Sequence, residues 1–60
     1  MESKLLKSYK GFTIEKSWEE WPDGTKYDIL YTAYQGDGSG VFDAAKTLSE
    51  LKTRINEYIR

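Results

Sequence analysis

The chain is 60 residues long, with 32% charged residues, 38% hydrophobic residues and a formal net charge of −1. It contains no Cys and no His, which excludes disulfides, zinc sites built on thiolate or imidazole, and acid–base catalysis by histidine. A chain this short forms a single domain that buries about 60% of the surface exposed in its unfolded form, which leaves no room for a cleft between two lobes. The high aromatic content of 15% favours a packed core over disorder.

No segment has the length and apolar character of a signal peptide or of a membrane span, for which about 18 apolar residues are needed. The sequence therefore predicts a soluble cytoplasmic protein with no membrane partner. Its charge is unevenly distributed along the chain. Residues 1–10 carry three lysines and one glutamate, residues 11–43 carry seven acidic residues and two lysines, and residues 44–60 carry four basic and two acidic residues. An acidic middle between mildly basic ends bears on the choice of partner.

The first half of the chain predicts a hairpin of two long strands. Residues 11–18 alternate apolar and polar side chains, which is typical of a half-buried strand. Its apolar face consists of Phe12, Ile14 and Trp18. Residues 5–9 are predicted either to extend this strand backwards or to belong to a loose tail, which would comprise residues 1–8. A turn is expected in Trp21-Pro22-Asp23-Gly24-Thr25, because Pro presets φ and Asp-Gly supplies the positive φ that closes a hairpin.

The second strand is expected at residues 26–34, which are rich in β-forming side chains. The face predicted to point inward consists of Tyr27, Ile29, Tyr31 and Ala33. The opposite face leaves Leu30 and Tyr34 toward solvent. A short third strand is expected at residues 40–45.

The end of the chain predicts an amphipathic helix. The start of this helix is indicated by a sequence typical of a capping box, Thr47-Leu48-Ser49-Glu50. The apolar stripe consists of Leu48, Leu51, Ile55, Tyr58 and Ile59. The whole chain, residues 1–60, is thus predicted as one α+β domain. A three-stranded antiparallel β-meander, residues 9–45, has one C-terminal helix, residues 47–59, packed on one face (βββα).

The stretch Tyr34-Gln35-Gly36-Asp37-Gly38-Ser39-Gly40-Val41-Phe42-Asp43 raises phosphate or cation binding as alternatives to a plain loop. A phosphate-binding loop leads directly into a helix N-terminus, whereas these glycines lead into a predicted strand. A calcium loop needs several alternating carboxylates, and only Asp37 lies within the loop. The stretch is therefore interpreted as a flexible link between the second and third strands. No catalytic residue, metal or cofactor is predicted.

A sheet with one helix leaves its other face uncovered, and here that face is acidic with apolar side chains between the acids. This pattern predicts a non-enzymatic module, a monomer or weak homodimer, that binds another protein with a basic surface. An ordinary wet sheet face is the alternative. Trp21 at the hairpin tip is a candidate anchor because Trp is enriched at binding hot spots. The candidate binding residues are Glu15, Glu19, Glu20, Trp21, Asp23, Asp28, Leu30 and Tyr34.

Two segments give the chain a resemblance to small proteins of phages and mobile elements. One is Tyr9-Lys10-Gly11-Phe12-Thr13-Ile14 before the hairpin. The other is Phe42-Asp43-Ala44-Ala45-Lys46-Thr47-Leu48-Ser49-Glu50-Leu51-Lys52, followed by Ile55-Asn56-Glu57-Tyr58-Ile59. The resemblance covers most of the chain, and its motifs encode a βββα core. It implies a class that acts by binding and includes anti-CRISPR-type inhibitors, and thus an inhibitor of a nucleic-acid-handling or defence protein in the host cytoplasm.

The βββα layout also resembles the arm-type DNA-binding domain of tyrosine integrases, which lays its sheet in the major groove. That resemblance implies a nucleic-acid-binding module as the alternative function. The acidic strands depart from it, because affinity for DNA depends largely on neutralising phosphates. Base stacking on the tyrosines would likewise need a positive groove, so a nucleic-acid partner is not expected. The basic residues available to the alternative are Lys46, Lys52, Arg54 and Arg60.

Overall fold

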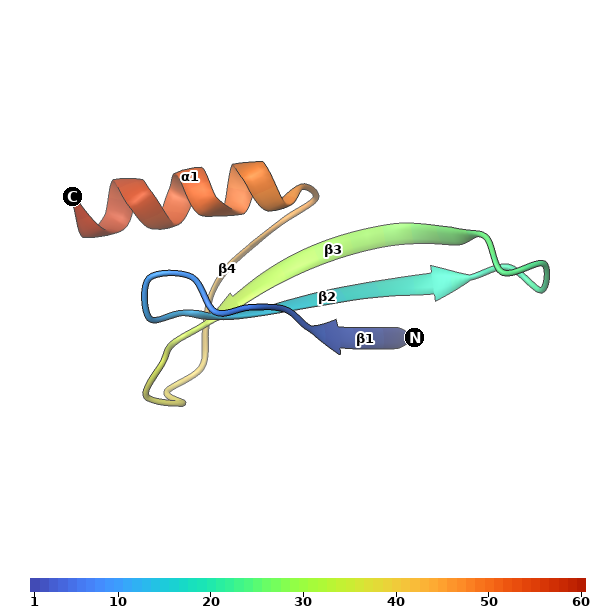
Figure 1. The fold of residues 1–60 in the computed structure, drawn as a ribbon, viewed down its shortest axis with the longest axis horizontal. Coiled ribbons are helices and arrows are strands. Elements are labelled where there is room, and N and C mark those ends of the chain that lie inside the picture. The colour runs from blue at the N-terminus through green and yellow to red at the C-terminus, as the bar shows by residue number, and fades with distance from the viewer.

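Four antiparallel strands and one C-terminal helix make up the protein, as the computed structural model of residues 1–60 shows (Figure 1). The elements are β1 (Glu2–Leu5), β2 (Thr13–Glu20), β3 (Lys26–Tyr34), β4 (Val41–Ala45) and α1 (Leu48–Ile59). Each strand pairs antiparallel with the next, so the sheet order is β1-β2-β3-β4. The predicted α+β class is confirmed, but the sheet has four strands where the sequence predicts three.

The additional strand is β1, which lies in the segment expected to be a loose tail or a strand extension. Lys10 and Gly11 both adopt positive φ, 49° and 88°. Tyr9 and Phe12 exchange two backbone hydrogen bonds of 2.9 Å across them. This is the two-residue turn that joins antiparallel strands with the correct twist. The four residues of β1 therefore fold back onto β2 and pair with it, although all their side chains are exposed.

The expected turn at the tip of the β2–β3 hairpin is present. The backbone N–H of Trp21 donates to the carbonyl oxygen of Thr25, and that of Gly24 donates to the carbonyl oxygen of Trp21, both at 2.8 Å. Gly24 has a φ of 92°, which a residue with a side chain rarely adopts. The Asp23-Gly24 pair thus predicts the turn because glycine permits the backbone conformation that the turn requires.

The glycine-rich stretch forms the link between β3 and β4. The N–H of Gln35 donates to the carbonyl oxygen of Gly40 at 2.8 Å and closes the loop. Gly36 lies directly against the Lys10–Gly11 turn, because a Cβ added at Gly36 would fall on the carbonyl oxygen of Gly11. The loop is therefore packed against the connection between β1 and β2, and is more tightly held than a free link.

An irregularity in the β2–β3 pairing changes which side chains face the helix. Ser17 pairs with Leu30 but Glu19 pairs with Tyr27, so β3 contains one extra residue between these two pairs. Asp28 in this bulge has a φ of 53°. Side chains alternate along a strand and directly paired residues share a face, so the bulge places Tyr27 on the face of Glu19. The prediction that Tyr27 points inward is wrong, because a bulge shifts the alternation by one residue.

The helix begins as predicted and its buried stripe forms the core. The hydroxyl of Thr47 accepts a hydrogen bond of 3.1 Å from the N–H of Glu50, which is the expected N-cap contact. Leu51 and Ile55 are fully buried. The complete core consists of Phe12, Ile14, Ala33, Ala45, Leu51 and Ile55.

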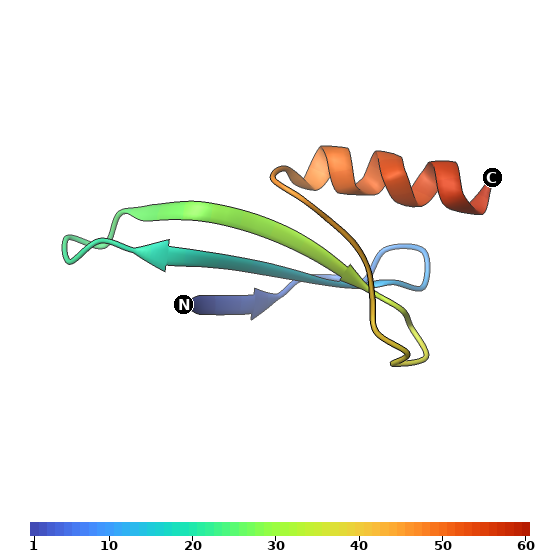
Figure 2. The ribbon, with the colours of Figure 1, turned by 180° about the vertical axis from the view of Figure 1, so that it is seen from behind.

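The helix covers only one end of the sheet. It packs on β3 and β4, and the β2–β3 hairpin extends beyond it (Figures 1 and 2). The molecule consequently measures 42 Å along its longest axis but only 21 and 16 Å along the others. This arrangement leaves two surfaces open: the whole sheet face away from α1, and the part of the helix-side face that lies along the projecting hairpin.

Candidate functional site

The sheet face away from α1, called here the outer face, gathers most of the predicted binding residues. Strand register places them there, because Leu5 pairs with Glu15, and Tyr34 pairs with Thr13 and Val41. Ser17 with Leu30 and Glu19 with Tyr27 extend the same face toward the hairpin tip. The outer face comprises Leu5, Glu15, Glu19, Trp21, Tyr27, Asp28, Leu30, Tyr34 and Val41. Of the eight predicted residues, Glu15, Glu19, Trp21, Asp28, Leu30 and Tyr34 are among them.

Several apolar side chains of the outer face are exposed to solvent. Leu5 is 67% exposed, Val41 60% and Trp21 54%. The Trp21 ring stacks on Tyr27 with 4.5 Å between ring centroids, which holds it at the hairpin end of this face. A shallow hollow of about 160 Å³ lies between Met1, Glu19, Leu30 and the Asp28 bulge. Apolar surface that a small domain leaves open in this way is typical of an interaction site.

The acids of the outer face are partly fixed by hydrogen bonds. The hydroxyl of Tyr34 donates to Oε1 of Glu15 at 2.7 Å, and this bond raises the pKa of Tyr34 because it favours the protonated phenol. Glu19 lies 3.6 Å from the amino group of Met1. No lysine or arginine side chain pairs with either carboxylate, so the outer face remains acidic.

Two predicted residues lie elsewhere. Glu20 pairs with Lys26 in the sheet and accepts a hydrogen bond of 3.1 Å from Nε1 of Trp18, which places it on the helix side. Asp23 lies in the tip turn, where its Oδ1 accepts the N–H of Thr25 at 2.8 Å. This bond lowers the pKa of Asp23 and gives the side chain a role in the turn. Both residues are predicted to bind because they belong to the acidic segment at the hairpin tip, although alternation along a strand already places Glu20 on the face opposite Glu19.

The opposite side of the sheet carries a surface that the sequence does not predict. The Nζ atom of Lys16 lies 5.8 Å from the centroid of the Trp18 ring and 5.8 Å from that of the Tyr31 ring. The Nζ atom of Lys26 lies 4.6 Å from the centroid of the Trp18 ring. Nearer the helix, the Nζ atoms of Lys10 and Lys52 lie 5.5 and 5.0 Å from the Tyr9 ring. We call this surface the lysine–aromatic strip. It consists of Lys4, Lys10, Lys16, Lys26 and Lys52 with Tyr9, Trp18 and Tyr31.

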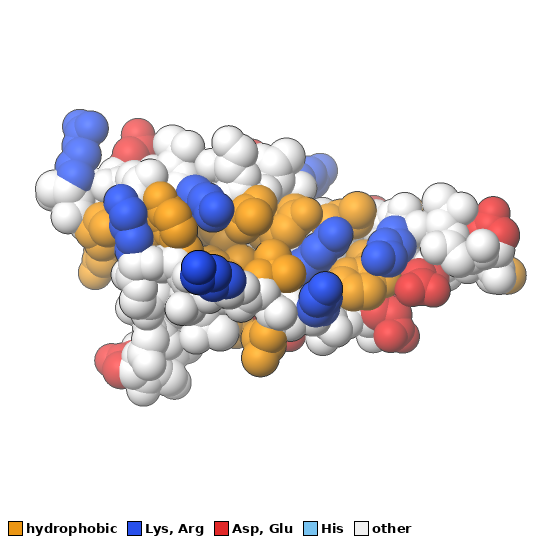
Figure 3. Space-filling view, in the orientation of Figure 1, with side chains coloured by type: hydrophobic (Ala, Val, Ile, Leu, Met, Phe, Trp, Pro, Cys, Tyr) orange, Lys and Arg blue, Asp and Glu red, His pale blue; other side chains and the backbone are white.

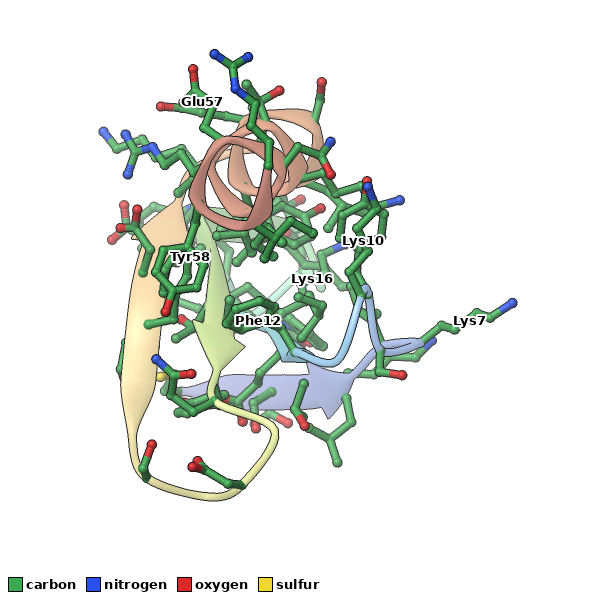
Figure 4. The ribbon with its side chains drawn as sticks, turned by 90° about the vertical axis from the view of Figure 1, so that its left-hand side faces the viewer. Lys7, Lys10, Phe12, Lys16, Glu57 and Tyr58 are labelled. Atoms are coloured by element: carbon green, nitrogen blue, oxygen red, sulfur yellow. The ribbon has the colours of Figure 1, made fainter.

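The strip is visible as a band of basic side chains with hydrophobic ones between them (Figure 3). At its helix end it meets a groove of about 450 Å³, formed by residues 6–9 with Leu48 and Lys52. Lys7 and Lys10 project on this side of the molecule (Figure 4), and Lys16 belongs to the same side because it pairs with Tyr31 on the helix-side face of the sheet. The charge pattern therefore differs sharply between the two faces, although the net charge of the chain is only −1.

The four basic residues predicted for the alternative function, nucleic-acid binding, do not form one surface. Arg54 is held by Asp43 at 3.1 Å and Glu50 at 2.9 Å, and its Nη1 donates to the carbonyl oxygen of Ala44. Lys52 lies over Tyr9 on another side of the helix, because residues two positions apart on a helix point in different directions. Lys46 precedes the helix and Arg60 ends it. Only Lys52 joins the lysine–aromatic strip.

Elsewhere, the structure brings no three acidic side chains together in a way that could hold a metal ion. In the glycine loop, Asp37 accepts the N–H of Ser39 at 2.9 Å, and its hydrogen bonds with Ser39 lower its pKa. No helix of the structure is long and apolar enough to cross a membrane.

No protein-family model matches this chain, and neither a curated protein nor a solved structure gives a significant match. The resemblance to phage proteins and to integrase domains therefore stays a prediction.

Proposed function

We propose that the protein is a non-enzymatic binding module that recognises another protein through its outer face. The observation that supports this is the combination of exposed Leu5, Trp21 and Val41 with Glu15 and Glu19 on one uncovered face. Exposed apolar side chains supply the buried area of an interface. Neither carboxylate pairs with a lysine or arginine side chain, so the two acids select the sign of charge on the partner.

The partner that fits this face is a protein with a basic patch around an apolar centre. Opposite potentials on the two surfaces speed association and reject partners of the wrong charge. Proteins that handle nucleic acids carry such basic patches where they bind phosphates. An inhibitor of such a protein would present an acidic face of this kind, and neither a cofactor nor a metal is needed for binding.

The test compares two glutamates by the same substitution. Glu19 lies on the outer face, whereas Glu57 lies on the far side of the helix (Figure 4). Proteins captured from a host lysate by the unmodified protein are identified, and the affinity of each is then measured for Glu19→Lys and for Glu57→Lys. We expect Glu19→Lys to weaken binding about tenfold or more, because it places like charges across the interface, and Glu57→Lys to leave it unchanged.

A second variant tests the apolar part of the same face. Leu30 is exposed on the outer face, so Leu30→Ser should weaken the same complex while far-UV circular dichroism shows an intact fold. The proposal is refuted if the captured partner binds Glu19→Lys and Leu30→Ser as tightly as it binds the unmodified protein. It is also refuted if no protein is captured at all.

A further inference from the structure

The lysine–aromatic strip carries unbalanced positive charge. Among basic groups, only Arg54 and the amino group of Met1 form ion pairs, so no lysine of the chain has a carboxylate partner within 4.0 Å. Lys4 pairs directly with Lys16 across β1 and β2. Like charges opposite each other in a sheet are destabilising, and an anion bound between them would remove that cost.

The strip also holds three aromatic rings that are half-buried and fixed by their surroundings. Tyr9 donates a hydrogen bond of 3.0 Å to Oδ1 of Asn56 on the helix, and the same oxygen accepts one of 2.7 Å from Lys10. Trp18 is held by its bond to Glu20. The Nζ atom of a lysine lies over the face of each ring, including Tyr31. A base that stacks on one of these rings takes the place of that ammonium group, which then pairs with the adjoining phosphate.

The surface is open and elongated rather than closed around a small molecule. The groove of about 450 Å³ at residues 6–9 and Lys52 lies at one end. From there the strip follows Tyr31, Lys16, Trp18 and Lys26 along the hairpin. Glu2 and Glu20 are the acidic residues on this side, both close to Trp18. An extended anionic chain with flat groups therefore matches the strip in shape, charge and chemistry.

We propose that the lysine–aromatic strip binds single-stranded nucleic acid. The charge summed along the strands argues against this proposal. However, Glu15, Glu19 and Asp28 of β2 and β3 lie on the outer face, whereas Lys16 and Lys26 of the same two strands lie on the strip. Paired bases in a duplex present edges rather than ring faces, so stacking on Tyr9, Trp18 and Tyr31 requires unpaired bases. An acidic peptide would satisfy the lysines but would leave the aromatic rings unused.

The two tryptophans allow a direct test, because Trp18 lies on the strip and Trp21 on the outer face. With excitation selective for tryptophan, the fluorescence of Trp21→Phe comes from Trp18 alone and that of Trp18→Phe comes from Trp21 alone. Each variant is titrated with a strand of about 12 thymidines or uridines, within the range of site sizes of small single-strand-binding folds. We expect the strand to quench Trp18 and to leave Trp21 unchanged.

Affinity is then measured by fluorescence anisotropy of the same labelled strand. Lys26→Ala and Lys46→Ala remove the same charge from the protein, but only Lys26 belongs to the strip. At about 50 mM salt, Lys26→Ala should weaken binding and reduce the salt dependence of log K by about 0.7, whereas Lys46→Ala should change only the weak long-range attraction. Trp18→Leu should cost about 5- to 100-fold in affinity, which corresponds to the loss of one stacked base.

The proposal is overturned if no strand binds at about 50 mM salt, where such contacts are strongest. It is also overturned if duplex DNA or poly-glutamate of equal length binds as well as the single strand, because binding would then need only charge. Equal losses for Lys26→Ala and Lys46→Ala would place the contact elsewhere. The outcome is independent of the outer-face proposal, since Glu19→Lys leaves the strip intact.

Discussion

Replacing Lys4 by Glu is expected to stabilise the free protein and to weaken its binding to single-stranded nucleic acid. Lys4 is exposed on the edge strand β1 and pairs directly with Lys16 on β2. The substitution converts a repulsive cross-strand pair into an attractive one. It also places a carboxylate on the lysine–aromatic strip, where it repels phosphates.

The size of the stability gain follows from the cross-strand pairing. A favourable or unfavourable charge pair in a sheet contributes about 0.2–1 kcal/mol relative to a neutral pair, so reversing the sign of one charge is worth about 1 kcal/mol. A domain of 60 residues has a total stability of about 3–9 kcal/mol. The gain should therefore raise Tm by about 4–8 °C.

Thermal unfolding followed by circular dichroism measures the first effect, and anisotropy with a labelled thymidine strand measures the second. Lys46→Glu makes the same charge change outside the strip and outside the sheet, and it is the matched control for binding. The Tm is compared with that of the unmodified protein, because a glutamate just before the helix would itself interact favourably with the N-terminal end of α1. The reasoning is refuted if Lys4→Glu unfolds at the same temperature as the unmodified protein and binds the strand as tightly as Lys46→Glu does. A lower Tm for Lys4→Glu would show that the two lysines do not repel each other in the folded protein.

Three further predictions concern stability. Ile55→Ala should lower the free energy of unfolding, measured with urea, by about 2–5 kcal/mol, because Ile55 is fully buried. The smaller change Ile55→Val should cost about 0.5–1.5 kcal/mol. A loss for Ile55→Ala below that of Ile55→Val would contradict the packing of α1. Gly36→Ala should destabilise the protein by about 1–3 kcal/mol, because its methyl group would overlap the Gly11 carbonyl. An unchanged urea midpoint would contradict the contact between the glycine-rich loop and the Lys10–Gly11 turn. Asp23 has a lowered pKa in the folded state, so its contribution is complete above about pH 4 and is lost as the pH falls through the folded pKa. Asp23→Asn should therefore lose less stability than the unmodified protein in an acid titration, and parallel pH profiles would contradict this.

The sequence predicts the parts of the fold that depend on local signals. The Asp23–Gly24 turn, the Thr47 cap and the buried stripe through Leu51 and Ile55 are all present. Each depends on residues close together in the chain, where turn geometry and helical spacing are sufficient. Strand β1 gives no such signal, because its exposed residues contribute backbone hydrogen bonds but almost no buried side chain.

The two surfaces show where sequence patterns stop being informative. Alternation places Glu15, Glu19, Leu30 and Tyr34 correctly on one face, because the extra residue of the bulge lies in β3 between Tyr27 and Leu30 and does not interrupt alternation along β2. The bulge at Asp28 moves Tyr27 to the other face, and a single extra residue leaves no mark in the composition. The lysine–aromatic strip draws on β1, the turn after it, the hairpin and the helix, so charges counted along the chain cannot reveal it.

The separation of charge between the two sides of one thin sheet has a consequence for ligands that bind to both. Glu15 and Lys16 are neighbours in β2 and point to opposite faces, so only one sheet separates the two sets of charges, a distance comparable with the Debye length of about 8 Å at physiological ionic strength. A nucleic-acid strand that neutralises the lysines leaves the outer carboxylates with less opposing charge behind them, so a basic protein is attracted more strongly. By thermodynamic reciprocity the basic protein then strengthens the hold on the strand by the same factor. A sheet of this kind would couple two oppositely charged ligands without changing shape, and added salt would weaken that coupling.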